Sequence, residues 1–249
     1  MSEVSPPPPT AAVLIIGNEI LTGKIADQNL GVLARHMRKL GVRLARAHTV
    51  LDDVETIAAD VRALARAHTW VFTSGGVGPT HDDVTIEGVA RAFDRRVVVS
   101  EELDGMLRRA YGDKLTDGHL LMARIPEGAR LVRSDSVPWP CVLVENVWVL
   151  PGVPEIFALK MSLVERELGQ GKSFVSVAVV CALDEGNLQP LLDRIVEAHP
   201  GVEIGSYPRW GDTEWRTKIT FDGRDRSIVE QTRDAFIAIL PEGSPVREG

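Results

Sequence analysis

Cysteine is scarce in this chain of 249 residues, which contains only Cys141 and Cys181. The two lie far apart and neither belongs to a C-x-x-C pair, so the sequence excludes a zinc ribbon and a disulfide framework. We expect both thiols to lie inside buried strands, because free cysteines are among the most buried residues.

Long hydrophobic runs are also missing. No stretch approaches the roughly 20 consecutive apolar residues that a membrane-spanning helix needs. Residues 1–4 lack the basic and then apolar pattern that begins a signal peptide. We therefore expect a cytoplasmic protein with no membrane partner.

The chain has no run of lysine or arginine either. Its 28 basic residues are outnumbered by 35 acidic ones, which gives a formal net charge of −7. Because binding to a phosphate backbone requires a basic surface, we expect no nucleic-acid partner. The six histidines form no H-E-x-x-H motif and no i, i+4 pair, which argues against a histidine-based zinc site.

The composition that remains, with 44% hydrophobic and 25% charged residues, is that of a globular protein able to bury a sizeable core. The length allows one large or two modest domains. We expect a disordered, proline-rich leader over residues 1–10, an α/β domain over residues 11–170 and a small α+β domain over residues 172–245.

In the larger domain, short apolar runs alternate with amphipathic helical patterns. This alternation is typical of a mostly parallel sheet covered by helices on both faces, so the expected fold class is a three-layer α/β/α sheet. The expected strands are 11–17, 42–50, 70–73 and 97–99, with a hairpin at 143–150, and the expected helices include 29–40, 57–64, 85–93, 103–110 and 156–168.

After residue 171 the order of the expected elements changes to βαββα, which suits a small α+β domain. Its strands are expected at 174–181, 202–207 and 216–221, and its helices at 188–198 and 228–240.

The segment from Thr73 to Thr85 reads T-S-G-G-V-G-P-T-H-D-D-V-T and runs from a buried strand into a helix. Its glycines allow positive φ angles and expose N–H groups to an anion, and the following helix N-terminus adds positive charge. Asp82 and Asp83 would repel a phosphate unless a divalent cation lay between them. The alternative is a glycine turn whose aspartates only cap the helix.

Polar residues also follow the neighbouring expected strands. Asn18 and Glu19 come after the first, with Asp27 and Asn29 further on, and Asp52 comes after the second. Because parallel strands end at the same edge of their sheet, we expect these side chains to gather there with the glycine segment. Each alone has a simpler interpretation as a cap or a solvated charge.

Residues 151–154, P-G-V-P, join the hairpin to the last helix of the larger domain. Pro154 falls near the first helical turn, where its missing N–H costs nothing. The segment is either a rigid turn or a backbone clasp on a ligand ring.

Together these motifs resemble the molybdopterin-binding (MoCF-like) domain, in particular its competence/damage-inducible protein A (CinA) branch, which is similar to the N-terminal domain of eukaryotic FAD synthase. Residues 172–245 resemble the small domain that follows in CinA proteins, and we do not expect the amidase domain of full-length CinA. The resemblance covers roughly residues 11–170 and rests on G-N-E-I-L-T-G at 17–23, Asp27, Asn29, S-G-G-V-G-P-T-H-D-D-V-T at 74–85 and P-G-V-P at 151–154.

The resemblance implies a MogA-like fold and the hydrolysis of a nucleotide diphosphate linkage, in ADP-ribose or an FAD-like compound, with Mg, Mn or Co. It implies catalytic roles for Asp83, Asp52 and Glu19 and metal ligation by Asp82, Asp83 and Glu19. The ligand-binding residues would be Asn18, Asp27, Asn29, Ser74, Gly75, Gly76, Gly78, Pro79, Thr80, Thr85, Pro151, Gly152 and Pro154.

Two other functions stay open. One is pterin-phosphate binding or adenylyl transfer in molybdenum-cofactor biosynthesis, and the other is a non-catalytic nucleotide-binding module. The expected partners are a small-molecule nucleotide or pterin ligand and further copies of the chain, because relatives of this domain form dimers or trimers.

Overall fold

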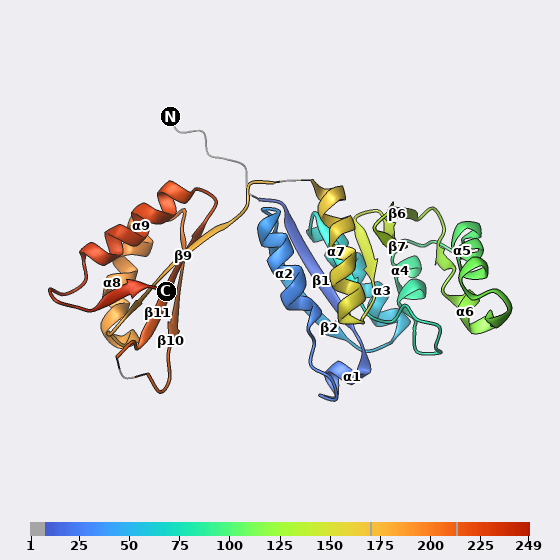
Figure 1. The fold of residues 1–249 in the computed structure, drawn as a ribbon, viewed down its shortest axis with the longest axis horizontal. Helices are drawn as coiled ribbons and strands as arrows, with labels where there is room; N and C mark the ends of the chain where they lie inside the picture. The colour runs from blue at the N-terminus through green and yellow to red at the C-terminus, as the bar shows by residue number, and fades with distance from the viewer. Residues whose placement is uncertain (1–7, 170, 213) are drawn as a thin grey trace. The chain divides into compact units, whose positions relative to one another are not determined.

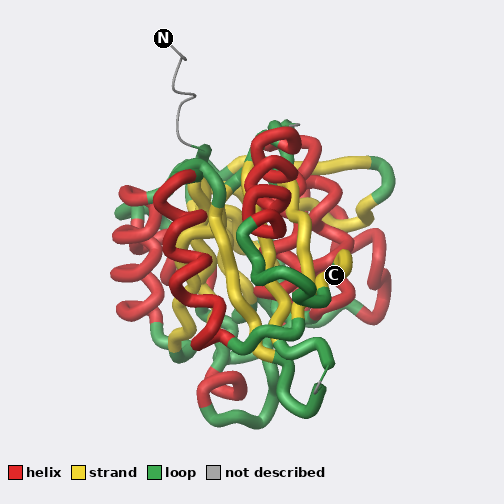
Figure 2. Tube along the Cα trace, turned by 90° about the vertical axis from the view of Figure 1, so that its left-hand side faces the viewer, coloured by secondary structure: helices red, strands yellow, loops and turns green. Residues whose placement is uncertain are grey.

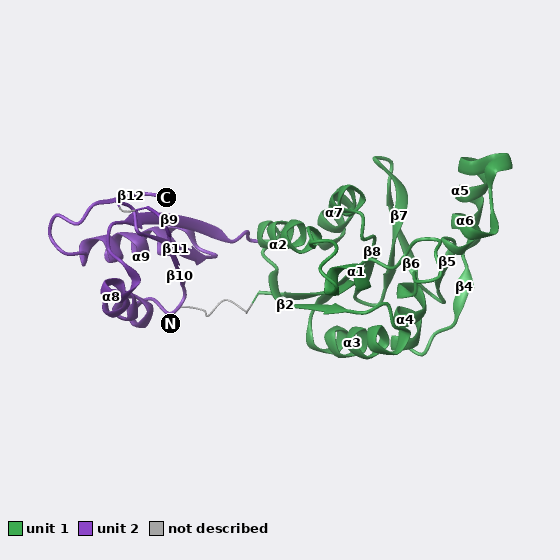
Figure 3. Ribbon diagram, turned by 90° about the horizontal axis from the view of Figure 1, so that it is seen from below, with its two compact units in different colours: residues 1–171 green, residues 172–249 purple. Residues whose placement is uncertain are grey.

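A computed structural model describes residues 8–169, 171–212 and 214–249, and it divides into two compact units, Met1–Gly171 and Lys172–Gly249 (Figure 3). Most of the expected proline-rich leader, residues 1–7, lies outside the described residues. One boundary of that leader was wrong, because Thr10 already begins the first strand.

A six-stranded sheet forms the centre of the first unit, in the order β2-β1-β3-β8-β7-β6 (Figure 1). The first four strands are parallel, whereas β7 runs antiparallel to β8 and β6 antiparallel to β7. The strands are β1 (Thr10–Ile16), β2 (Arg43–Val50), β3 (Trp70–Ser74), β6 (Arg130–Ser134), β7 (Val137–Val144) and β8 (Val147–Leu150).

Helices cover both faces of this sheet (Figures 1 and 2). On one face, buried side chains of α2 (Asn29–Lys39) and α7 (Pro154–Leu168) pack against alternate residues of β1 such as Val13. On the other face, α3 (Val54–Ala67), α4 (Thr85–Ala92) and α5 (Glu101–Tyr111) pack against the intervening residues such as Leu14. The predicted three-layer α/β/α class is confirmed.

The parallel strands bring four chain segments to one edge of the sheet. Ile16 pairs with Val50, Ile15 with Ser74, and Ser74 with Leu150, so the C-terminal ends of β2, β1, β3 and β8 lie in line. The convergence predicted from the strand pattern is therefore confirmed, and the loops after Ile16, Ser74 and Leu150 are free to form one site.

Several short elements had no sequence signal strong enough to predict them. These are β6, β5 (Arg124–Pro126), which pairs with the expected strand β4 (Val97–Val99), and three short helical segments. The helical segments are α1 (Asn18–Leu21), η1 (Gly112–Lys114) and α6 (Asp117–Leu121).

The second unit has an antiparallel sheet in the order β10-β11-β9-β12, with α8 and α9 supplying apolar side chains to its core. The predicted βαββα order is confirmed, but the expected end at residue 245 was too early, because β12 pairs with β9. The elements are β9 (Val175–Cys181), α8 (Glu185–Ala198), β10 (Glu203–Pro208), β11 (Thr217–Gly223), α9 (Arg226–Ala238) and β12 (Val246–Glu248).

Over the ranges that the structure describes, no helix is long and apolar enough to cross a bilayer.

Candidate functional site

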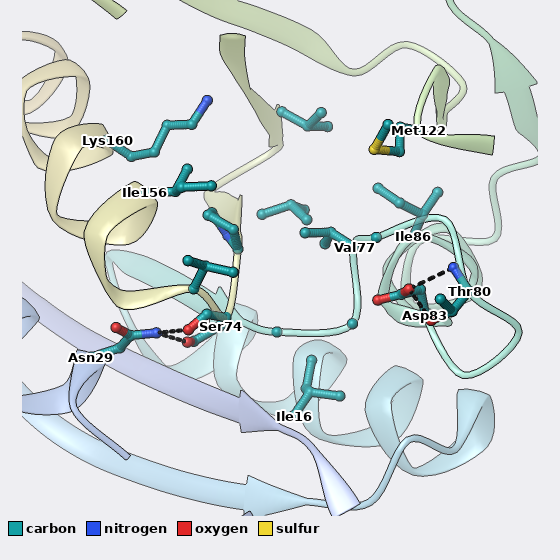
Figure 4. Close-up of a pocket in the computed structure, with 18 of the residues that line it drawn as sticks. Ile16, Asn29, Ser74, Val77, Thr80, Asp83, Ile86, Met122, Ile156 and Lys160 are labelled. Carbon is teal, nitrogen blue, oxygen red and sulfur yellow. Dashed lines mark hydrogen bonds between the residues drawn. The ribbon is translucent and has the colours of Figure 1, made fainter. Parts of the chain in front are cut away.

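A pocket of about 820 Å³ opens at the edge where the parallel strands end (Figure 4). Its lining comes from the segments after β1, β3 and β8, together with residues of α4, α5, β7 and α7. A volume of this size suits a drug-sized or nucleotide-sized ligand. Most of the residues predicted for the site lie on its wall, and these are Glu19, Asp27, Asn29, Ser74, Gly75, Gly76, Gly78, Thr80, Asp83, Pro151, Gly152 and Pro154.

The glycine segment after β3 adopts the conformation that its sequence predicts. Gly75 has φ +108° and Gly76 has φ +63°, both in the range that favours glycine. Buried Thr85, at the start of α4, fixes the turn: its Oγ1 donates to the carbonyl of Gly75 (2.7 Å) and its N–H to that of Gly76 (2.9 Å). Thr85 is therefore a positioning residue behind the loop.

Asp83 holds the far end of this loop. Its Oδ2 accepts hydrogen bonds from the backbone N–H of Thr80 (2.8 Å) and from Thr80 Oγ1 (2.5 Å) (Figure 4). The alternative in which the aspartates cap the helix is not supported, because the N-cap of α4 is Val84 and makes no side-chain capping bond. Asp83 therefore both stabilises the loop and lines the pocket.

Asn29 links the three loops from the other side. Its Nδ2 donates to Ser74 Oγ (2.9 Å) and to the carbonyl of Gly152 (2.8 Å) (Figure 4). The side chain is almost fully buried, and its Oδ1 has no hydrogen-bond partner in the part of the chain that the structure describes. A buried carbonyl oxygen without a hydrogen-bond donor is uncommon in folded proteins, so this one is unusual in the structure.

Replacing Asn29 with aspartate should lower the free energy of unfolding of the first unit by about 2 to 3 kcal/mol. The variant loses both N–H donors and places a carboxylate against the carbonyl oxygen of Gly152, which can only accept. Urea denaturation measures the change. The matched control is Gln28→Glu, which makes the same amide-to-carboxylate change at an exposed neighbour and should alter stability little. Equal stability of both variants would show that the Asn29 link does not hold the loops together.

Asp27 and Glu19 occupy different positions on the wall. Asp27 accepts from the backbone N–H groups of Asn29 (3.4 Å) and Leu30 (2.9 Å), so it also stabilises the start of α2. Glu19 lies in α1, and its carboxylate folds back so closely on Gly17 that a Cβ there would lie 2.6 Å from Oε1.

Five of the predicted residues do not line the pocket. Asn18 and Asp52 bond to each other instead: the Asn18 N–H donates to Asp52 Oδ2 (2.8 Å), and the Asp52 N–H donates to Asn18 Oδ1 (3.3 Å). This pair ties the ends of β1 and β2 together. The other three are Pro79, Asp82 and Thr85.

Asp82 is exposed, and its Oδ1 lies 2.5 Å from Thr80 Oγ1, whose single proton it shares with Asp83. This hydrogen bond lowers the pKa of the Asp82 carboxyl group below its ordinary value. Among the described residues, no three His, Cys, Asp or Glu side chains lie close enough together to hold a metal ion. Glu19, Asp82 and Asp83, which the resemblance implies as metal ligands, therefore do not form such a group in this structure. Only Glu19 and Asp83 of this set face the pocket.

The pocket also has an apolar wall and a buried lysine that were not predicted from the sequence. Ile16, Val77, Ile86, Met122 and Ile156 surround the space beside the glycine loop (Figure 4). These residues come from five separate segments, so no local pattern predicts their meeting.

Lys160 of α7 is only 3% exposed and lines the same pocket. Its signal was available in the sequence, because Phe157, Lys160, Met161 and Val164 follow the spacing of one buried helix face. A lysine on such a face is unusual and points to a special environment.

The fold and the site define the class of this protein: a three-layer α/β protein with a ligand-sized pocket where its parallel strands end. The chain belongs to the molybdopterin-binding domain family, because the family model described as "Probable molybdopterin binding domain" matches residues 12–168. A second model, "FAD synthase, middle domain", matches residues 173–248.

Relatives match across both units. A protein of Archaeoglobus fulgidus is 34% identical over 228 residues, which cover 92% of this chain and 96% of that protein. A "Probable FAD synthase" of Caenorhabditis elegans is 29% identical over 248 residues, 89% of this chain and 48% of that protein. The chain therefore spans about half the length of the FAD synthase that it matches.

Among solved structures, CinA from Thermoplasma acidophilum superposes with a TM-score of 0.60 at 30% identity, covering 66% of this chain and all of that one. This similarity confirms the predicted resemblance to the CinA branch.

Proposed function

We propose that the first unit is a divalent-metal-dependent hydrolase that binds a nucleotide diphosphate compound, such as ADP-ribose or FAD, and cleaves its phosphoanhydride bond. The observation that carries the proposal is the composition of the pocket. One wall holds the glycine loop and Asp83, and another is apolar and large enough for a ring system.

The glycine loop suits a pyrophosphate. Its backbone turns through positive φ angles at Gly75 and Gly76, and it leads into the N-terminus of α4, an arrangement that favours anions. The hydrogen bond of Thr85 to Gly75 fixes the start of the loop, and that of Thr80 to Asp83 fixes its end. The loop therefore needs no rearrangement to present its N–H groups to a ligand.

The carboxylates of the pocket fit a metal that arrives with the ligand. Mg²⁺ is commonly held by one or two carboxylates plus substrate phosphates rather than by a complete protein cage. Asp83 and Glu19 are the predicted metal ligands that line the pocket. When bound, a divalent ion would neutralise phosphate charge and lower the pKa of a coordinated water.

The other roles in the proposed reaction belong to residues of the chain. Asp83 orients the attacking water, the loop N–H groups hold the two phosphates, and the apolar wall keeps bulk water from the ring. Water adds to one phosphorus and the other phosphate leaves, so ADP-ribose yields AMP and ribose 5-phosphate, and FAD yields AMP and FMN.

The names of the relatives support a nucleotide or pterin ligand but do not choose among reactions. The description of the matching family favours one second candidate, which is pterin-phosphate binding or adenylyl transfer to a pterin phosphate.

A hydrolysis screen tests the proposal. The purified chain, incubated with ADP-ribose or FAD and with Mg²⁺, Mn²⁺ or Co²⁺, should release AMP, and EDTA should stop the release. Binding of these compounds without AMP release under any metal would reject the hydrolase and favour a binding module. An adenylylated product from molybdopterin and ATP would favour the second candidate.

A further inference from the structure

Lys160 is a buried cation that the proposed hydrolysis does not use. It extends from α7, and its Nζ donates to two backbone carbonyls of β7, those of Trp139 and Pro140 (2.9 Å to the latter). A lysine ammonium carries three N–H donors, so these two acceptors leave one donor for another partner.

No anion of the described chain balances this charge. The group that interacts electrostatically with Lys160 is the thiol of Cys141, and burial raises the pKa of that thiol to about 11. The thiol is therefore neutral at physiological pH and cannot serve as a counter-ion. Burial also lowers the pKa of Lys160, which reflects the cost of holding an ammonium group away from water.

The third donor belongs to a side chain that lines the pocket. Lys160 lines it together with Trp139 and Pro140. Figure 4 shows Lys160 on the same side as Ile156, apart from the glycine loop. A ring system seated against the apolar wall would present its edge substituents to this part of the pocket. An oxygen acceptor there would complete the coordination of Nζ, whereas an amino group would meet a donor-only lysine.

We propose that Lys160 is a specificity-determining residue that donates a hydrogen bond to a ring carbonyl of the ligand, so that the pocket selects oxo-substituted heterocycles over amino-substituted ones. The inference rests on the proposed function only for the placement of the phosphates at the glycine loop. It favours FAD-like substrates, whose flavin ring bears carbonyl groups, over substrates whose only ring is adenine.

Inosine diphosphate and adenosine diphosphate are matched probes, because they differ at ring position 6, which carries a carbonyl in one and an amino group in the other. Titration calorimetry on the full chain with Mg²⁺ should show that inosine diphosphate binds about tenfold more tightly. Lys160→Met should reduce this preference to about twofold or less. Lys172→Met, which removes an exposed lysine of the second unit, should leave the preference unchanged.

The readout is a ratio of two affinities in one protein sample, so partial unfolding of a variant does not alter it. Lys160→Arg keeps the charge and the donors and should retain part of the preference. It provides a second test if the methionine variant does not fold. Equal affinities in the unsubstituted chain, no binding of either nucleotide, or a preference that survives Lys160→Met would overturn the inference. A preference that depends on Lys160 in a protein that releases no AMP would support the inference while the hydrolase proposal fails.

Discussion

Asp83→Asn should lower metal-dependent AMP release by on the order of 100-fold while leaving the first unit folded. The carboxylate lies on the pocket wall, next to the loop where the phosphates are proposed to bind. Asparagine keeps an oxygen that can accept the bonds from Thr80, so the loop retains its end contact. What the variant loses is the negative charge that would hold a divalent ion and orient water. Steady-state AMP release at saturating Mn²⁺ measures the effect.

Variants of two further aspartates distinguish the proposed metal-binding role of Asp83 from a general effect of removing negative charge. Asp135→Asn makes the same change in the exposed turn between β6 and β7, away from the pocket, and should keep the original rate. Asp82→Asn tests the neighbour that resemblance assigns to metal binding but that does not line the pocket. A fall in rate for Asp82→Asn and none for Asp83→Asn would reverse our assignment of the two residues.

The position of the site could be predicted from the sequence because it follows from strand direction. Gly17 and Ser74 each come directly after a short apolar run, and helical patterns separate the runs. Such an order requires parallel strands, and parallel strands end at one edge. The positive φ angles at Gly75 and Gly76 could be predicted for a similar reason, since closely spaced glycines after a strand favour a tight turn.

The choice among the residues at that edge could not be predicted. Asp52 follows β2, which is an edge strand of the sheet, whereas the pocket lies beyond β1, β3 and β8. The βαβαβ pattern fixes strand direction but not strand order, so it could not place Asp52 at the side of the site. Its reciprocal bonds with Asn18 are a consequence of the β1–β2 pairing.

Lys160 shows a second limit of prediction from sequence. Its helix was expected, and its spacing with Phe157 and Met161 places it on the buried face. The acceptors for its ammonium are, however, backbone carbonyls of β7. Every residue has a backbone carbonyl, so the amino-acid sequence does not indicate which one accepts a hydrogen bond. The apolar wall could not be predicted from the sequence either, because Met122 and Ile156 come together only in the tertiary fold.

Gly75→Ala should lower the free energy of unfolding of the first unit by about 3 kcal/mol and abolish detectable binding of adenosine or inosine diphosphate. Gly75 has φ +108°, which alanine adopts only with strain, and an added Cβ would overlap the backbone carbonyl oxygen of Ile16. The backbone of Gly152 also passes close by, since a Cβ built on Gly152 would lie 3.2 Å from the Gly75 Cα. The loop would therefore have to move, and its hydrogen bond to the Leu150 carbonyl would break.

Gly23→Ala is the matched control, because Gly23 also has positive φ (+71°) but has open space around its Cβ position. It should cost only about 1 kcal/mol, the strain of a left-handed residue, and should leave nucleotide binding intact. Urea denaturation and titration calorimetry on both variants separate backbone strain from steric overlap. If Gly75→Ala were no less stable than Gly23→Ala and bound nucleotide normally, the close packing of the loop against β1 would not be needed for the site. The proposed pyrophosphate position would then have to be abandoned, because it depends on that packing to aim the loop N–H groups into the pocket.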